Sequence, residues 1–375
     1  ESIRAKAAES PDESWWRASL LDTFQRRGEF EAAVAVAEGP LPEGWRVLSA
    51  GQLGLILAET EGGVRVEQLI DRANGQSFLT AAPLPLFELT MQEVADAPST
   101  EERADETGKD SPAPKPETCR LSAVTGWEQA DIILPAAEGL QITWRRPKDA
   151  RLGDLSVTAR VVPDHKQNAF RWAIEVDNPS DRWTTWRVAF PQVAVADLGP
   201  EAEVFLPRGS GEVQAGLWQR ESRHQGTYPN GWTTMAFMAA YDADRQTGLY
   251  VGMHDPLGGT KDILVESRPT DRAVVFAFDH PVEDMGRPGN DFHPEGYAVW
   301  QFLRGDWFDA ALIYRDWVRR EARWWPELGP DGRTDTPAWM RELPVWLLGG
   351  GSPEGFTPAV EEFAKFAGVP VGVHW

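Results

Sequence analysis

The sequence predicts a mainly β protein whose antiparallel sheets are followed by a linking helix and by one strand–helix–strand unit of a parallel α/β domain. Three observations predict this fold class. Short β-favouring runs alternate with Gly, Asn, Asp and Pro from Trp45 to Leu303. A helical period replaces them after Asp306, and a strand–helix–strand pattern with short connections begins at Leu343.

The composition is that of a soluble protein that can bury a core. The chain has 375 residues, of which 42% are hydrophobic and 25% charged, a length that favours two domains. No apolar run reaches the roughly 18 residues of a membrane span, and the net charge of −21 disfavours nucleic acid and anionic lipid as partners. The 18 Trp against 5 Tyr suit both sandwich cores and the faces of sugar rings.

Residues 1–44 are predicted to form an N-terminal helical segment. Within residues 12–27, Trp16, Leu20 and Phe24 recur every four positions, with acidic residues before them and Gly28 after them. This spacing predicts an amphipathic helix.

Residues 45–304 are predicted to form antiparallel sheets, because about a dozen strand-like runs follow one another without intervening helices. Residues 61–63 and 242–248 have the turn chemistry of hairpin connections. Residues 95–117 contain no aromatic residue and, apart from Ala, no aliphatic one, so we expect a mobile excursion between strands.

Residues 305–342 are predicted to form a linking helix and a loop. Asp306 is a good N-cap, and apolar residues follow it at helical spacing until Pro326 ends the helix: Trp307, Ala311, Tyr314, Val318 and Trp325.

Residues 343–375 are predicted to form a strand, a helix that begins after Thr357-Pro358, and a second strand. Trp346 is expected in the core. One such unit leaves most of a parallel sheet uncovered, so we expect it to be the start of a domain that is truncated here. Active sites of α/β folds lie at the carboxyl ends of such strands, and the chain would stop where a catalytic domain begins.

Several motifs together resemble a known arrangement. They are LGLIL (53–57), VEQLID (66–71), NGQSF (74–78), YPNG (228–231), Gly248–Tyr250, HDP (254–256), GDWF (305–308) and YRDW (314–317). This order resembles the galactose-mutarotase-like β-supersandwich at the front of several bacterial glycoside hydrolases. The resemblance covers roughly residues 45–375 and points to an uncharacterised bacterial family, distantly similar to endo-α-N-acetylgalactosaminidases.

The resemblance implies that a β-supersandwich and a linking helix precede a (β/α)8 (TIM) barrel, which is incomplete in this chain. In the family the catalytic carboxylates come from later barrel strands, so no catalytic residue is assigned here. The implied partners are carbohydrate and the chain's own missing C-terminal barrel.

Residues 223–232 are the first candidate binding loop. They combine His224, Tyr228 and Trp232 with a cation, two amides and two Gly, groups that can stack on a sugar ring and bond its hydroxyls. The alternative is a plain Pro-Asn-Gly turn in which Trp232 anchors the next strand. If the loop binds, Trp232→Ala lowers oligosaccharide affinity of the full-length protein without unfolding it, whereas unchanged affinity would remove the loop from the site.

The other candidate substrate-binding residues are histidines and their neighbours. Asp255 could orient His254, or the pair could simply shape a turn. His293 lies in a Pro- and Gly-rich loop, and His374 and Trp375 end the last strand, where they either face a ligand or pack under the barrel rim.

Other sites are not supported by the sequence. The acidic residues 242–248 do not match a calcium loop, and Gly349–Gly351 fits no phosphate-binding fingerprint, so no metal and no cofactor are expected. His165 and His280 are expected at the surface, and Arg160, Arg171, Arg182 and Arg187 on solvated strand faces.

The first functional interpretation is the N-terminal portion of a glycoside hydrolase, itself without turnover. The alternative is a non-catalytic carbohydrate-binding or structural β module. An epimerase built on the sandwich would need a His and Glu pair on one concave sheet, and no spacing selects one. Carbohydrate-degrading enzymes often work outside the cytoplasm, but no signal peptide in this chain fixes its compartment.

Overall fold

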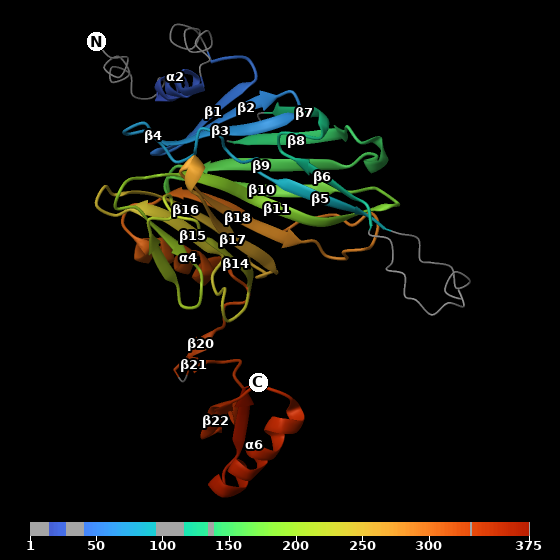
Figure 1. Ribbon diagram of the computed structural model, residues 1–375, viewed down its shortest axis with the longest axis vertical. Helices are drawn as coiled ribbons and strands as arrows, with labels where there is room; N and C mark the ends of the chain where they lie inside the picture. The colour runs from blue at the N-terminus through green and yellow to red at the C-terminus, as the bar shows by residue number, and fades with distance from the viewer. Residues whose placement is uncertain (1–14, 28–40, 95–115, 134–138, 331, 375) are drawn as a thin grey trace, which may run out of the picture. The chain divides into compact units, whose positions relative to one another are not determined.

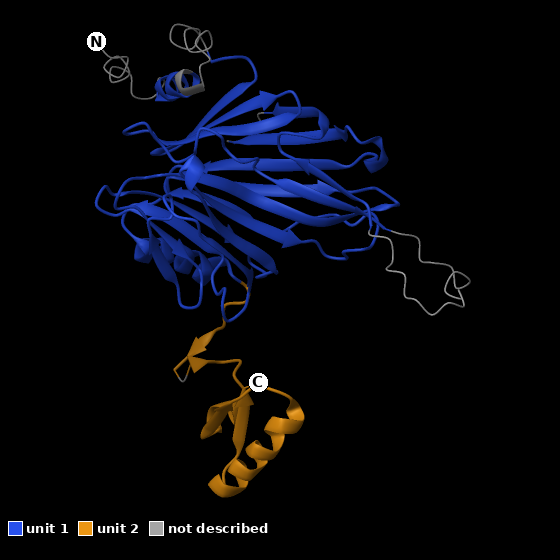
Figure 2. Cartoon of the chain, in the orientation of Figure 1, with its two compact units in different colours: residues 1–322 blue, residues 323–375 orange. Residues whose placement is uncertain are grey.

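The structure is a computed structural model that describes residues 15–27, 41–94, 116–133, 139–330 and 332–374. The chain divides into two compact units, which Figure 2 colours separately: unit 1 spans residues 1–322 and unit 2 residues 323–375. In the described part of the chain, no helix is both long and apolar enough to cross a membrane.

Unit 1 is built on two large antiparallel sheets (Figure 1). The nine-stranded sheet has the order β13 (Glu212–Ala215), β12 (Glu203–Leu206), β15 (Phe237–Asp242), β16 (Thr247–His254), β19 (Tyr297–Phe302), β10 (Ala169–Asp177), β9 (Ser156–Asp164), β8 (Leu140–Pro147) and β7 (Trp127–Ile133). The six-stranded sheet has the order β14 (Arg223–Tyr228), β17 (Lys261–Arg268), β18 (Ala273–Pro281), β11 (Trp183–Ala196), β5 (Glu88–Glu93) and β6 (Thr118–Ser122). The mainly β, sandwich-like architecture confirms the fold class at that level. Short 3-10 turns, η1 (Ala150–Leu152) and η2 (Pro269–Asp271), connect strands.

A four-stranded sheet carries the N-terminal helix of unit 1. It consists of β1 (Trp45–Ala50), β2 (Leu53–Thr60), β3 (Gly63–Asp71) and β4 (Gln76–Ser77). Helix α2 (Trp15–Arg27) buries Leu20 and Phe24 against Ile56, and the Phe24 and Trp45 rings meet edge to face at 5.4 Å. The predicted amphipathic helix is therefore present, and the apolar stripe read from the sequence is the one it buries.

One contiguous apolar cluster fills the space between the sheets. Its largest fully buried side chains include seven tryptophans: Trp127, Trp144, Trp172, Trp183, Trp218, Trp300 and Trp317. Indole rings bury large apolar areas while the ring N–H can still reach a carbonyl, as Trp144 Nε1 does to the Ala123 carbonyl at 2.9 Å. Seven of the 18 tryptophans therefore serve the core.

Helix α4 (Trp307–Glu321) lies where the linking helix is predicted and packs on β15 and β16. Asp306 caps it as predicted, in a reciprocal capping box with Asp309. The helix ends at Glu321, before the predicted Pro326. It buries Trp317 and leaves Trp307 exposed, because the buried stripe is set by residues 310, 314, 317 and 318 and not by a period counted from residue 307.

Unit 2 contains the predicted parallel unit. A short hairpin of β20 (Leu328–Gly329) and β21 (Gly332–Arg333) and helix α5 (Ala338–Glu342) precede β22 (Val345–Leu348), α6 (Pro353–Ala367) and β23 (Val371–His374). Strands β22 and β23 pair in parallel. Helix α6 begins at Pro353, four residues before the predicted cap at Thr357, because Ser352 accepts a hydrogen bond from the Gly355 amide and Pro353 fits the first turn.

Trp346 differs from its prediction, and most of the predicted excursion cannot be compared. Trp346 was expected in the core but is 45% exposed, since the sheet of unit 2 has only two described strands to cover it. Residues 95–115 of the predicted excursion lie outside the described residues. The residue limits of the four predicted segments stay predictions, as does the assignment of residues 343–375 to the start of an incomplete (β/α)8 barrel.

Candidate functional site: a polar pocket beside the linking helix

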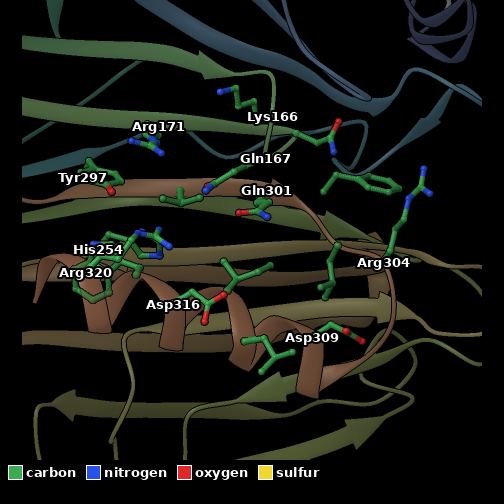
Figure 3. Close-up of a pocket in the computed structure, with 17 residues that line it drawn as sticks. Lys166, Gln167, Arg171, His254, Tyr297, Gln301, Arg304, Asp309, Asp316 and Arg320 are labelled. Carbon is green, nitrogen blue, oxygen red and sulfur yellow. The ribbon is translucent and has the colours of Figure 1, made fainter. Parts of the chain in front are cut away.

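A polar pocket lies over β10, β16 and β19 of the nine-stranded sheet, along the edge of α4 (Figure 3). We call it the helix-edge pocket. Its volume is about 440 Å³, in the range of small-ligand sites. Its lining combines aromatic, amide and charged side chains, including Lys166, Arg171, His254, Tyr297, Gln301, Arg304, Asp309, Asp316, Trp317 and Arg320.

Strand register brings these side chains to one face. On β19, Tyr297, Val299 and Gln301 alternate with residues that point to the opposite face. Tyr297 pairs with His254 on β16, while Val299 pairs with Arg171 on β10. Directly paired residues of antiparallel strands point to the same side, so three strands contribute to one surface.

A glycine makes room for the buried end of this surface. Tyr250, Gly252 and His254 occupy successive positions on the same face of β16, and the Tyr250 hydroxyl reaches over Gly252 to His254 Nε2 at 2.9 Å. A Cβ atom on Gly252 would lie 2.4 Å from that hydroxyl oxygen. The contact therefore requires glycine at position 252.

His254 is buried and neutral. Its ring stacks on Trp317 of α4, with centroids 4.6 Å apart and planes 18° from parallel. Burial, with smaller contributions from Arg171 and Arg320, lowers the pKa of His254 to about 3. At neutral pH the imidazole carries no charge and acts as a hydrogen-bonding part of the helix–sheet contact.

At the exposed end of the pocket, two cations have no ion-pair partner among the described residues. In the described ranges, neither Lys166 nor Arg320 forms a salt bridge, whereas Arg171 pairs with Asp164 at 2.7 Å and lies over the Tyr297 ring. The Gln301 side-chain oxygen is shielded from solvent and has no hydrogen-bond partner among the described residues. A buried acceptor of this kind is costly unless a ligand or water satisfies it.

The remaining charged groups of the pocket are held by partners. Asp309 accepts from the Asp306 amide in the helix cap, and Asp316 pairs with Arg315 at 2.8 Å. Arg304 donates to the Gln52 side chain. Figure 3 shows Arg304 and Asp309 at one end of the pocket and Arg171, Tyr297 and Arg320 at the other, with Gln301 between them.

Three predicted site residues come together beneath α4. The Asp255 carboxylate accepts from the Leu257 and Gly259 amides and pairs with the buried Lys261 ammonium at 2.9 Å. That ammonium lies 4.8 Å from the centroid of the Tyr228 ring. Asp255 therefore fixes the Lys261 ammonium and the backbone of residues 257–259. His254 Nε2 is instead hydrogen-bonded to the Tyr250 hydroxyl. Tyr228, His254 and Asp255 are all largely buried, and a direct role in binding substrate stays a prediction.

The predicted binding loop 223–232 is mostly a strand. Residues 223–228 form β14, whose inward residues include His224 and Tyr228. Burial and the nearby Arg208 lower the pKa of His224. Trp232 follows at the turn and is 75% exposed, with its amide bonded to the Asn230 side chain. Trp232 thus does not anchor the core, and it can contact a ligand.

The other predicted residues lie apart. His293 is half-exposed and pairs with Asp177 at 2.9 Å. His374 is exposed at the end of β23 in unit 2, and Trp375 lies outside the described residues. His280 was expected at the surface but is buried in β18, with Nε2 2.9 Å from the Phe190 carbonyl oxygen, because it occupies an inward position of the strand.

Sequence reasoning identified His254 but missed most of the other residues that line the helix-edge pocket. The sequence predicts Arg171 on a solvated strand face and does not mark Gln301 or Arg320 as site residues, yet all three line the pocket. Their proximity depends on the β19–β10 pairing and on how α4 crosses the sheet, which local patterns do not encode. Across the part of the chain that the structure describes, no group of three or more His, Cys, Asp or Glu side chains is arranged to hold a metal ion.

Comparison with known proteins gives a distant relationship to glycoside hydrolases. A family model described as "Domain of unknown function (DUF6259)" matches residues 292–375. A protein of Monosiga brevicollis named "Putative glycoside hydrolase 22789" is 25% identical over 241 residues, which cover 62% of this chain and 20% of that protein. The chain therefore spans about one fifth of the length of this curated relative.

Solved structures share the fold. The alpha-N-acetylgalactosaminidase NagBb of Bifidobacterium bifidum, in complex with Gal-NHAc-DNJ, matches with a TM-score of 0.54 at 11% identity, over 88% of this chain and 51% of that chain. An Escherichia coli K12 protein described as a "Putative aldose 1-epimerase" matches 70% of this chain and all of its own, at 12% identity and a TM-score of 0.41. The match to NagBb thus shows that a solved glycosidase structure shares the fold of this chain.

Proposed function

We propose that this chain is the N-terminal portion of a glycoside hydrolase that cleaves O-glycosyl bonds. In this proposal the helix-edge pocket holds part of a glycan, and unit 2 begins a (β/α)8 barrel whose later strands carry the catalytic carboxylates. The residues of this chain bind and position the carbohydrate, while the acid and base come from the continuing chain.

The apolar surface of unit 2 is the observation that carries the proposal. Leu348 on β22 is 79% exposed and Phe366 on α6 is 89% exposed. Parallel sheets are normally covered on both faces by helices, so these side chains fit the interior of a larger α/β domain. The distant similarity to a glycoside hydrolase supports the chemistry of that domain.

The chemistry of the helix-edge pocket supports a glycan as the ligand. Tyr297 supplies an aromatic side chain, and the Gln301 oxygen, which has no partner among the described residues, can accept a hydrogen bond from a hydroxyl group. Lys166 and Arg320 can donate hydrogen bonds to ring or glycosidic oxygens. Sugar recognition needs this combination of flat apolar and directional polar contacts.

The test of activity compares the 375-residue chain with a longer product of the same reading frame on aryl glycosides. We expect turnover from the longer product and none from the 375-residue chain. Robust activity of the purified 375-residue chain would contradict the assignment of the catalytic carboxylates, and an inactive longer product that binds no glycan would contradict the function.

The test of the pocket uses two neighbouring arginines on α4. Arg320→Ala removes a lining cation and is expected to lower glycan affinity of the longer product about tenfold. Arg319→Ala is the matched control, since Arg319 is also exposed on α4 but does not line the pocket. Equal affinities of the two variants would remove the pocket from the binding site.

A further inference from the structure

The outward face of the six-stranded sheet carries a second hollow of about 440 Å³, which we call the sheet-face hollow. It shares no lining residue with the helix-edge pocket. Its main lining residues are Glu88, Arg120, Trp186, Arg187 and Asp279, and hydroxyl and amide side chains of β5 and β6 complete it. The function proposed above makes no use of it.

Strand register explains the shape of the hollow. Ala189 on β11 pairs with Glu88 on β5 at one side and with Asp279 on β18 at the other. Paired residues point to one face, and neighbouring strands lie about 4.8 Å apart. The short Ala189 side chain therefore forms a floor between two carboxylates whose strands are about 10 Å apart.

A β-bulge supplies an aromatic side chain to the same hollow. The pairing of β11 with β5 shifts between Thr185 and Arg187, which leaves Trp186 as the extra residue. A bulge of this kind re-aims side chains. Here it brings the half-buried Trp186 indole and the Arg187 guanidinium to the hollow together.

Ion pairs hold the Arg187 side chain of the hollow in place, and one Asp279 oxygen has no hydrogen-bond partner among the described residues. Arg187 is clamped by Asp279, with Nε 2.7 Å from Oδ2, and by Asp262. The second Asp279 oxygen, Oδ1, is shielded from solvent and has no hydrogen-bond partner within the described ranges. Burial raises the pKa of Asp279. A hydroxyl donor from a ligand would satisfy this oxygen.

We propose that the sheet-face hollow binds one pyranose unit of a neutral glycan. The Trp186 indole contacts a face of the ring, Asp279 and Glu88 accept hydrogen bonds from hydroxyl groups, and Arg120 and Arg187 donate hydrogen bonds to hydroxyl oxygens. Two carboxylates and two guanidiniums balance in the lining, so the hollow offers no net attraction to an acidic sugar. This site extends the carbohydrate contacts of the protein to a sheet that the proposed function leaves out.

The experiment screens the 375-residue chain on immobilised neutral oligosaccharides of glucose, galactose and N-acetylhexosamines, with sulfated and uronic counterparts. Calorimetry then measures the affinity of the best free oligosaccharide. We expect a neutral ligand, about tenfold weaker binding by Trp186→Ala and three- to tenfold weaker binding by Glu88→Gln. Trp307→Ala is the matched control, because Trp307 is a half-exposed indole on α4 that does not line either pocket.

Absence of neutral glycan binding at millimolar ligand, or unchanged affinity in Trp186→Ala, overturns the inference. If Trp186→Ala lowers the Tm, Glu88→Gln and Arg120→Ala decide, since both side chains are exposed and unchanged affinity in both also overturns it. Binding that survives Trp186→Ala but is lost in Arg320→Ala would assign the glycan to the helix-edge pocket. In that case the proposed function stands and this inference fails.

Discussion

At the scale of single residues, β16 shows how one glycine permits a buried polar contact. Tyr250 and His254 lie on either side of Gly252, and their hydrogen bond passes over the position where a side chain would stand. The sequence showed that His254 follows an apolar strand. The hydrogen-bond partner of His254 could not be predicted from the sequence. The adjacent Asp255 is the obvious candidate, but its carboxylate pairs with Lys261.

Gly252→Ala is expected to destabilise the protein. The added methyl group would lie 2.4 Å from the Tyr250 hydroxyl, so the ring must move and its bond to His254 is lost. We expect a loss of about 1–3 kcal/mol in the free energy of unfolding, measured with urea. Gly231→Ala is the control, since its Cβ would meet nothing within 4 Å. Equal stability of the two variants would contradict this account.

The two buried histidines make stability depend on pH. The pKa of His254 is lowered to about 3 and that of His280 to about 4, both chiefly by burial. Between these values and the ordinary 6.5, the unfolded chain binds protons that the folded protein does not, so stability falls as the pH is lowered from about 6.5 toward 4.

Urea unfolding at several pH values tests this dependence. Each histidine contributes a slope of up to about 1.4 kcal/mol per pH unit. His254→Gln is therefore expected to flatten the curve below pH 6.5. An unaltered slope in His254→Gln would show that the imidazole becomes protonated in the folded state.

At the scale of elements, α4 shows which parts of a helix can be predicted from sequence. Its start was predictable, because Asp306 carries a capping signal that acts through local bonds. Its buried face was predicted only in part, since Tyr314 and Val318 are buried as expected whereas Trp307 is exposed. Trp317 is buried instead, where it stacks on His254 in the sheet below. The helix-edge pocket could not be predicted for the same reason, because α4 forms one of its walls.

Asp306→Ala is expected to lower the free energy of unfolding of unit 1 by about 1 kcal/mol. The substitution removes the acceptor for the Phe308 amide and one half of the capping box. Asp316→Ala, on the exposed surface of the same helix, serves as the control and should change stability by less than about 0.5 kcal/mol. A similar loss in both variants would mean that charge, and not capping, stabilises the helix.

At the scale of the whole molecule, the sequence predicted the order of sandwich, linking helix and parallel unit but not the order of strands within the sheets. Strand β19 pairs with both β16 and β10 in the sheet, although the three strands are far apart along the chain. Such pairings follow from how distant apolar faces meet in the core and not from local periodicity. Both pockets depend on them, so neither could be located before the sheet order was known.

Removal of unit 2 should leave unit 1 folded and should lower the amount of exposed apolar surface that a dye can bind. The main apolar cluster ends at Val318, so a chain that stops at Ala322 keeps every residue of that core and should keep its main thermal transition.

Unit 2 exposes Leu348 and Phe366, and exposed apolar patches bind hydrophobic dyes. We therefore expect the 375-residue chain to bind more ANS than the shortened chain, and Phe366→Ser to lower ANS binding while Phe308→Ser, at a half-exposed site on α4, has a smaller effect. If the shortened chain binds as much dye as the longer one, the apolar side chains of unit 2 are already covered, and the argument that they belong inside a larger α/β domain loses its basis.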